Sequence, residues 1–196
     1  MRQGFGITFV DLDETLFRTY AKINVIKNGN VTKKLTNKEF NNYRRKPGES
    51  FDFGEFKDAR LFKKTSKPVT KLIKRIKKMI RRIKETNSKS RIIVLTARPD
   101  MDNKEIFLEA FREQGIDVDR QDIVYIHRTA HLKGTVAQKK QRVMQDYIEH
   151  GKYQRCRLID DDQQNLAALK ELAATHPGME FYGLLAKTDG TLKRIH

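Results

Sequence analysis

The stretch ITFVDLDETLF, from Ile7 to Phe17, places two aspartates, Asp11 and Asp13, directly after an apolar run. A short apolar run bounded by polar residues is typical of a buried strand. Carboxylates held this close repel one another. The cost of this repulsion is tolerable mainly where a cation lies among the acids. The stretch therefore predicts a buried strand that ends at a functional site.

Apolar runs and helical patterns alternate along the rest of the chain. The apolar runs span residues 6–10, 91–96, 122–127, 156–160 and 179–185, and apolar residues recur at helical spacing over 69–85, 106–111, 136–148 and 166–172. Runs that are apolar throughout are typical of parallel strands covered on both faces by helices. The pattern predicts an α/β fold: a doubly wound, Rossmann-like sheet of five parallel strands with helices on both faces.

Residues 18–66 interrupt this alternation. Asn28 and Gly29 stand between two short β-prone segments, which is a strong signal for a hairpin, and the segment is rich in aromatic residues. We expect a catalytic core of residues 1–17 and 67–196, with residues 18–66 as a small β-rich cap or flap. Its aromatic residues are expected to form the flap's own small core, with base-stacking platforms as the alternative.

Positive charge is concentrated in one part of the chain. The 196 residues carry a formal net charge of +16, and residues 57–91, with 15 basic and 2 acidic residues, account for +13 of it. The helix expected over 69–85 has one apolar stripe, so its lysines and arginines must crowd the remaining surface. Two interpretations stay open: a solvated basic face, or a surface that binds the phosphate backbone of a nucleic acid.

Composition also limits the class of protein. Cys156 is the lone cysteine, which excludes an internal disulfide framework, and no apolar run approaches the roughly 18 residues of a membrane-spanning helix. No charged leader with an apolar core and cleavage site opens the chain. We expect a soluble, cytoplasmic protein without a membrane partner, and the oligomeric state stays open.

Acidic and hydroxyl residues follow several of the expected strands. Asp11 and Asp13 follow the first, Thr96 ends the second, and Asp160 and Asp161 end the fourth. In a doubly wound sheet, ligands bind beyond the carboxyl ends of the strands, so these side chains should gather at one edge. Oxygen ligands without Cys or His favour Mg²⁺ together with a substrate phosphate. The sequence therefore predicts a magnesium and phosphate site.

These residues carry a family resemblance. The segments DLDETLF, VLTAR, a lysine in GTVAQKKQRV, and LIDDDQQN resemble, in order, the four motifs of the haloacid dehalogenase superfamily of phosphotransferases. The resemblance spans residues 5 to 170 and implies that Asp11 attacks phosphorus to form an aspartyl-phosphate. It implies that Asp13 protonates the leaving oxygen and then activates water, and alternate residues of an extended segment do project to the same side.

The resemblance also implies roles for neighbouring residues. Thr15 would position Asp13, and Thr96 would hydrogen-bond the phosphoryl oxygens. Arg98, two residues after Thr96, is expected to contact the substrate.

The metal ligands and the lysine follow from the same resemblance. Asp11, the carbonyl of Asp13, and Asp161 would bind Mg²⁺, with Asp160 as a further ligand or as a residue behind the ligands. A threonine four residues earlier favours Lys139 as the lysine that neutralises the nucleophile and the phosphate. Lys140 is the alternative, as a residue that binds substrate. Asn165 stands where a further acid is common in the family, so we expect it behind the metal ligands.

Each motif alone has an ordinary structural explanation: an acidic loop, a strand end, or a turn in which Asp162 caps the helix that begins near Gln163. Together they predict a Mg²⁺-dependent phosphomonoester hydrolase, and charge favours nucleic-acid ends or nucleotides as the phosphorylated substrate. A small-molecule phosphatase is one alternative. A nucleic-acid-binding module that keeps the fold with weak or lost catalysis is another, because fold does not fix function.

Overall fold

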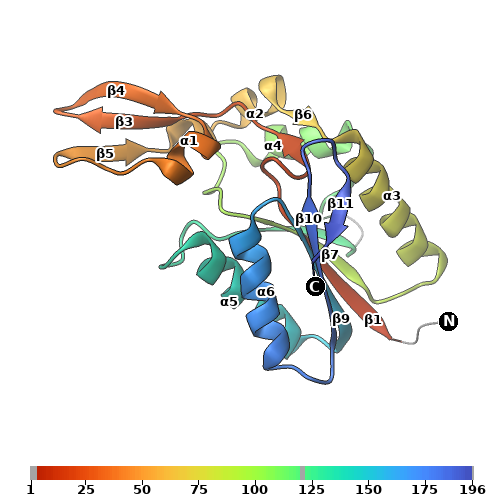
Figure 1. Cartoon of the computed structure of the whole chain (residues 1–196). Helices are drawn as coiled ribbons and strands as arrows, with labels where there is room; N and C mark the ends of the chain where they lie inside the picture. Colours follow the sequence, from red (N-terminus) through yellow and green to blue (C-terminus); the bar gives the residue numbers. More distant parts are fainter. Residues whose placement is uncertain (1–3, 120–121, 196) are drawn as a thin grey trace.

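The computed structural model describes residues 4–119 and 122–195, and a mostly parallel sheet forms its centre (Figure 1). Within the described residues this sheet has six strands in the order β11-β10-β9-β1-β7-β8. Their bounds are β1 (Phe5–Val10), β7 (Arg91–Thr96), β8 (Val124–Arg128), β9 (Tyr153–Asp160), β10 (Glu180–Ala186) and β11 (Leu192–Arg194). The five strands predicted from sequence are all present and run parallel to one another.

The expectation of only five strands was wrong. The sixth, β11, has three residues and pairs antiparallel with β10 across a tight turn. Gly190 in this turn has a φ of +76°, a conformation that glycine adopts without strain. A three-residue strand of mixed polarity gives no apolar run, so its sequence carried no strand signal.

Four helices cover the sheet: α3 (Thr70–Glu85), α4 (Lys104–Arg112), α5 (Val136–His150) and α6 (Gln163–Ala174). Figure 1 shows α5 and α6 on one side of the sheet and α3 on the other. Capping residues in the local sequence fix where three of these helices begin. Asn103 caps α4, Thr135 forms a capping box with Gln138 at α5, and Asp162 caps α6 as predicted.

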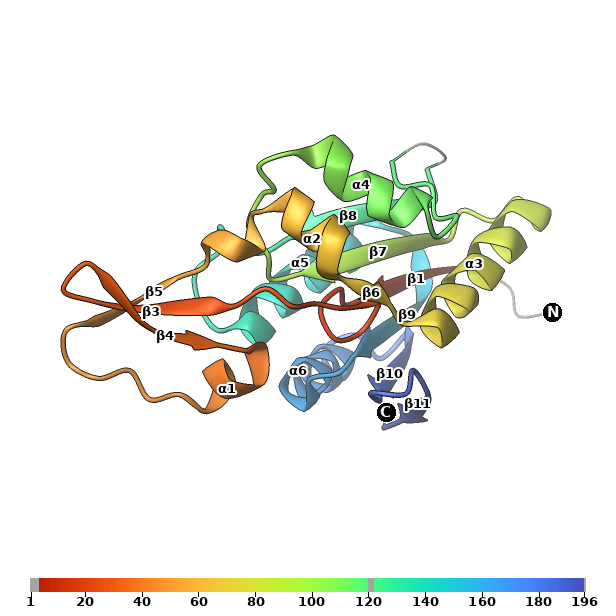
Figure 2. The same cartoon turned by 90° about the horizontal axis from the view of Figure 1, so that it is seen from above.

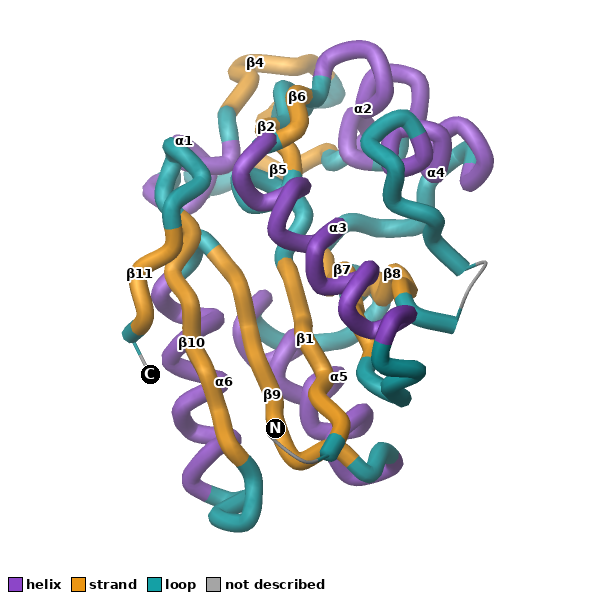
Figure 3. Tube along the Cα trace, turned by 90° about the vertical axis from the view of Figure 1, so that its right-hand side faces the viewer, coloured by secondary structure: helices purple, strands orange, loops and turns teal. Residues whose placement is uncertain are grey.

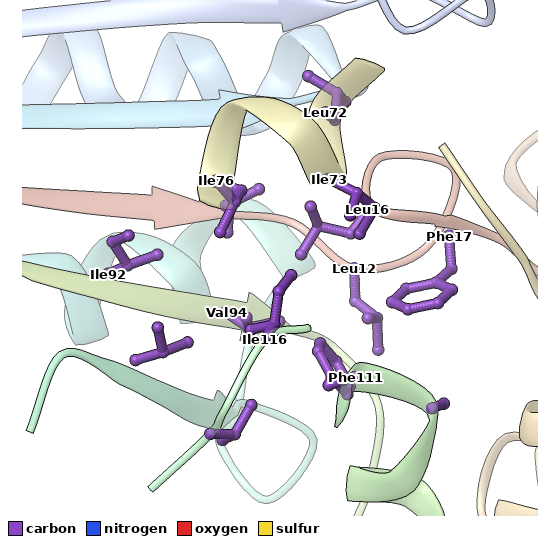
Figure 4. Packing of buried hydrophobic residues seen from close by; sticks show 14 of the residues in the cluster. Leu12, Leu16, Phe17, Leu72, Ile73, Ile76, Ile92, Val94, Phe111 and Ile116 are labelled. Carbon is purple, nitrogen blue, oxygen red and sulfur yellow. The ribbon is translucent and has the colours of Figure 1, made fainter. Parts of the chain in front are cut away.

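The side of the sheet that carries α3 and α4 holds the larger core. Leu72, Ile73 and Ile76 of α3 pack onto this face, which includes Ile92 and Val94 of β7 (Figure 4). Phe17, Phe62, Phe107 and Phe111 add a chain of edge-to-face aromatic contacts.

The opposite side of the sheet has a core of its own. Ile7 and Phe9 of β1 point to this face, where Val143, Met144 and Ile148 of α5 meet Leu166, Leu169 and Leu172 of α6. Because alternate residues of a strand point to opposite faces, β1 supplies Ile7 and Phe9 to one core and Val10 to the other.

Helix cover is incomplete over β9 and β10. Seen from the α3 side, α3 crosses near β1, whereas among the described residues no helix lies in front of β9, β10 and β11 (Figure 3). Arg155, Arg157 and Tyr182, on the open side of these strands, are partly exposed, whereas Cys156 and Leu158 are buried under α5 and α6. The expectation that the strands are covered on both faces therefore fails for this part of the sheet.

Residues 18–66 contain a separate three-stranded sheet, which extends beyond the end of the main sheet (Figure 2). Its strands are β3 (Ile23–Lys27), β4 (Asn30–Leu35) and β5 (Glu49–Asp52), followed along the chain by a 3-10 turn at Gly54–Phe56, and a short helix, α1 (Asn37–Asn42), lies between β4 and β5. Asn28 and Gly29 form the predicted hairpin with φ values of 51° and 76°. Ile23, Val25, Leu35 and Phe56 form a small core with the partly buried Phe40, Tyr43 and Phe51.

Three short elements connect this sheet to the rest of the molecule. The short strands β2 (Phe17–Arg18) and β6 (Lys67–Pro68) pair antiparallel at its base. The helix α2 (Ala59–Thr65) packs against α4, and its residues Ala59 and Phe62 belong to the larger core. Among the described residues, no helix has both the length and the apolar character needed to cross a membrane.

Candidate active site

Three aspartates meet at the carboxyl ends of β1 and β9. These strands are parallel neighbours, Val10 is level with Ile159, and the Asp11 amide donates to the Ile159 carbonyl at 2.9 Å. This register brings Asp11 beside Asp160 and Asp161, with one carboxylate oxygen from each within 4.8 Å of the others. Among the described residues, these three are the group of acids placed to share a cation.

A buried lysine already lies among these acids. The Lys140 Nζ donates to Asp11 Oδ1 at 2.5 Å and to Asp160 Oδ2 at 2.8 Å, and all three residues are buried. Burial alone would lower the pKa of Lys140, but the charges of Asp11 and Asp160 reverse that effect and hold its pKa above the ordinary value. Lys140 is therefore a fixed positive charge against Asp11.

The structure brings Lys140 to the acids in place of Lys139, the residue that sequence spacing favoured. Consecutive residues on a helix point about 100° apart, so only one of the two can face the sheet. Lys140 lies on the same face of α5 as the buried Val143 and Met144, whereas Lys139 is partly exposed. Helical periodicity, read from Val143 and Met144 back to Lys140, was the signal that could have distinguished the two.

The acids keep an excess of negative charge despite this lysine. Burial, opposed by Lys140 and reinforced by Asp160, Asp161 and Asp13, raises the pKa of Asp11 well above its usual range. Partial burial and the charge of Asp160 raise the pKa of Asp161 to about 6. One lysine thus offsets only part of the repulsion, and a further cation would relieve the rest.

The surroundings of Asp160 and Asp161 distinguish their roles. Asp160 Oδ2 binds Lys140, and its Oδ1 accepts from the Asn165 side chain at 3.0 Å and from the Asp162 amide at 2.9 Å. Both oxygens of Asp160 are therefore already engaged inside the protein. Asp161 reaches solvent, and its Oδ1 accepts from the buried Thr15 hydroxyl at 3.2 Å.

Of the neighbouring residues, Asn165 lies where the resemblance indicated and Thr15 does not. Asn165 lies behind Asp160, away from direct contact with Asp161. Thr15 was expected to position Asp13, yet its hydroxyl contacts Asp161. The turn at Glu14, which has a φ of 60°, reverses the chain between Asp13 and Thr15, so the simple alternation of an extended segment does not apply there.

Asp13 is held by an arginine and a threonine. The Arg98 Nε lies 3.0 Å from both carboxylate oxygens of Asp13, and Nη2 lies 2.7 Å from Oδ1. The Thr19 hydroxyl adds a donor at 2.8 Å. Asp13 contributes no carboxylate oxygen to the group formed by Asp11, Asp160 and Asp161, among the residues that the structure describes.

Arg98 is itself enclosed, which differs from the expected contact with substrate. Its side chain is 2% exposed, and its Nη1 donates to the Phe56 carbonyl at 3.1 Å. Its guanidinium lies 4.8 Å from the Phe56 ring centre and 4.9 Å from that of Phe62. Arg98 therefore ties Asp13 to the base of the flap. Neither Thr19 nor this arrangement of Arg98 had a signal in the sequence, because both depend on how the flap folds back.

Thr96, another of the predicted site residues, lies at the end of β7. It is fully buried, and its Oγ1 accepts from the Arg98 amide at 3.1 Å. Its carbonyl accepts from the Thr129 amide at 2.9 Å. The hydroxyl therefore fixes the turn that carries Arg98, and its proton stays available as a donor.

The chemistry of the donors indicates which metal fits. The acids offer oxygen atoms only, and hard oxygen donors suit Mg²⁺, which keeps several waters and takes one or two protein carboxylates. Since both oxygens of Asp160 are engaged, Asp11 and Asp161 are the better ligands, and Asp160 serves mainly to hold Lys140.

Comparisons of this chain with protein-family models, with curated proteins and with solved structures found no match. A functional assignment therefore depends on the geometry of the site and on the motifs themselves.

Proposed function

We propose that this protein is a Mg²⁺-dependent phosphomonoester hydrolase of the haloacid dehalogenase type, built on a Rossmann-like, doubly wound α/β core. The observation that carries the proposal is the Lys140 ammonium bound to both Asp11 and Asp160, in a cluster of three acids beyond the ends of two parallel strands. A buried cation of this kind favours the ionised form of Asp11, which is the nucleophile, and offsets the charge of an incoming phosphate.

In the first step, an oxygen of Asp11 attacks phosphorus, the bond from phosphorus to the ester oxygen breaks, and Asp13 delivers a proton to the departing oxygen. In the second step, Asp13 takes a proton from water, which attacks the aspartyl-phosphate, releases phosphate and restores Asp11. Arg98 and Thr19 hold the Asp13 carboxylate in one orientation for both steps.

Asp11 and Asp161 would hold the metal. When bound, Mg²⁺ would neutralise phosphoryl charge and orient the phosphate. Thr15 orients Asp161, which is the kind of support that ligands commonly receive from residues behind them.

Charge supports nucleic-acid ends or nucleotides as the substrate class. Eight basic residues of α3 are exposed: Lys71, Lys74, Arg75, Lys77, Lys78, Arg81, Arg82 and Lys84. Such a concentration of one sign attracts a polyanion without selecting its sequence. A phosphorylated polynucleotide end, which carries many phosphates, therefore fits the chain better than a small metabolite with a single phosphate does.

Phosphate release from end-phosphorylated oligonucleotides and from mononucleotides, with Mg²⁺ and with chelator, tests the proposal. Activity should require Mg²⁺, and Asp11→Asn should abolish it while leaving the circular dichroism spectrum unchanged. Asp13→Asn should slow alkyl phosphates more than an activated aryl phosphate, because only a poor leaving group needs the proton. Release at the wild-type rate by folded Asp11→Asn protein would refute the mechanism.

A further inference from the structure

The open face of the main sheet carries a basic and aromatic row. Across neighbouring strands, Thr8 of β1 is level with Arg157 of β9, and Arg157 is level with Tyr182 of β10. Arg194 of β11 lies next to them, opposite Leu184. In Figure 3 this region lies to one side of α3, in front of α5 and α6.

The arginines of this row are arranged around the Tyr182 ring. The Arg194 guanidinium lies 4.9 Å from the ring centre and that of Arg157 lies 5.8 Å from it, on strands to either side. Tyr182 remains partly exposed, and its hydroxyl donates to Glu180 at the start of the same strand. An accessible aromatic ring between two arginines offers a flat surface and positive charge within a few ångströms.

Basic residues concentrate on this part of the face. Burial first, then the charges of Arg75 on α3 and of Arg155, lower the pKa of Arg157. Glu180, level with Arg155, adds an acid to this part of the face. The basic surface of α3 thus continues onto the open sheet, and an anion bound between them would relieve the repulsion.

We propose that this open face binds single-stranded nucleic acid, with a base stacked against Tyr182 and the backbone phosphates held by Arg157, Arg194 and Arg75. Base stacking on an aromatic side chain beside a positive groove is the usual way in which proteins hold single strands. A duplex hides its base faces, and an anionic membrane or an acidic protein has no bases to stack. The partly exposed ring therefore favours single strands over the other polyanions.

The row also lies close to the acidic site. Arg157 and Asp160 lie three residues apart on β9, which is about 10 Å along a strand. A nucleic-acid strand bound to this face has a short path over the edge of the sheet to Asp11. The inference that the end of the nucleic acid reaches the acids rests on the proposed function. Binding to the open face does not depend on catalysis.

Binding of an unphosphorylated, fluorescently labelled oligothymidylate, followed by anisotropy over a range of salt concentrations, tests the proposal independently of phosphatase activity. Arg75→Gln with Arg194→Gln removes two exposed charges, one on α3 that acts on Arg157 and one beside the Tyr182 ring. Lys152→Gln with Lys170→Gln is the matched control, since it removes two exposed charges outside the row. The first pair should weaken binding and reduce the salt slope by about 1.4, at about 0.7 per phosphate contact, whereas the control should change affinity less than about twofold.

Tyr182→Leu separates stacking from charge. It should weaken oligothymidylate binding by roughly five- to a hundredfold and leave binding of heparin, a polyanion without bases, unchanged. Equal affinity of the two double variants would overturn the proposal, and so would Tyr182→Leu protein that binds oligothymidylate as the parent does. If the parent protein shows no phosphatase activity but these differences in binding are observed, the result would count against the proposed function alone.

Discussion

Replacing Lys140 by methionine tests the arrangement of charges at the heart of the proposed site. Methionine keeps most of the length of the side chain but removes the ammonium that binds Asp11 at 2.5 Å and Asp160 at 2.8 Å. Both carboxylates are buried and would lose their cation. Breaking a buried ion pair from one side costs about 3–5 kcal/mol, because the remaining charge is left unpaired in a poorly polarisable interior.

This cost converts to a large fall in melting temperature. A domain of this length loses about 2–4 °C per kcal/mol, so Lys140→Met should melt roughly 6–20 °C below the parent in metal-free buffer. Lys139→Gln changes the neighbouring, partly exposed residue and should stay within about 0.5 kcal/mol. The comparison also decides between the two lysines, since the sequence alone favoured Lys139.

The pH dependence of the deficit has a defined sign. Burial already raises the folded-state pKa of Asp11, and without Lys140 it rises further above the unfolded value, so the folded state binds more protons than the unfolded chain. Stability then falls as the pH rises. Lys140 itself stays charged from pH 5 to 8, because its pKa is raised from 10.5. The deficit of Lys140→Met should therefore be larger at pH 8 than at pH 5.

Thermal unfolding by circular dichroism or scanning fluorimetry, at both pH values and with and without Mg²⁺, measures these effects. Mg²⁺ should stabilise Lys140→Met more than it stabilises the parent, because it supplies the missing positive charge. A melting temperature within 2 °C of the parent at pH 8, or a deficit as large in Lys139→Gln, would refute the reasoning.

Three further predictions follow from the same geometry. The metal-free protein should lose stability as the pH rises from about 4 to 6, since the folded-state pKa values of Asp11 and Asp161 are raised, the latter to about 6. Stabilisation by Mg²⁺ should accordingly be larger at pH 7.5 than at pH 5, and equal shifts in melting temperature would contradict this. Thr15→Val should weaken Mg²⁺ binding by about tenfold in calorimetry, whereas Thr15→Ser, which keeps the hydroxyl that binds Asp161, should not. Arg98→Lys should retain more activity than Arg98→Met and shift the pH–rate profile less, because lysine keeps a positive charge beside Asp13. It should still fall short of the parent, because it loses the contact of two nitrogens with the carboxylate. Indistinguishable pH–rate profiles of the two variants would argue against a positioning role for Arg98.

Much of the scaffold was predictable because local sequence specifies it. The five apolar runs became parallel strands, and the helical patterns became α3 to α6, since burial selects apolar residues at the period of each element. The Asn28–Gly29 hairpin and the Asp162 cap were also correct, because both depend on conformations and hydrogen bonds within a few residues. The strand β11 and the open face were missed, because a short polar strand and an uncovered sheet leave no such local pattern.

The sequence by itself determined that Asp11, Asp160 and Asp161 meet, because parallel strands bring their carboxyl ends to one edge of a sheet. Only the tertiary structure decided which partners these acids have. The packing of α5 turned Lys140 toward Asp11, and the turn at Glu14 sent Thr15 to Asp161. The return of the chain at Phe56 enclosed Arg98 against Asp13. Each of these contacts joins side chains from separate elements, so it depends on the packed orientation of those elements, which no local pattern of residues encodes.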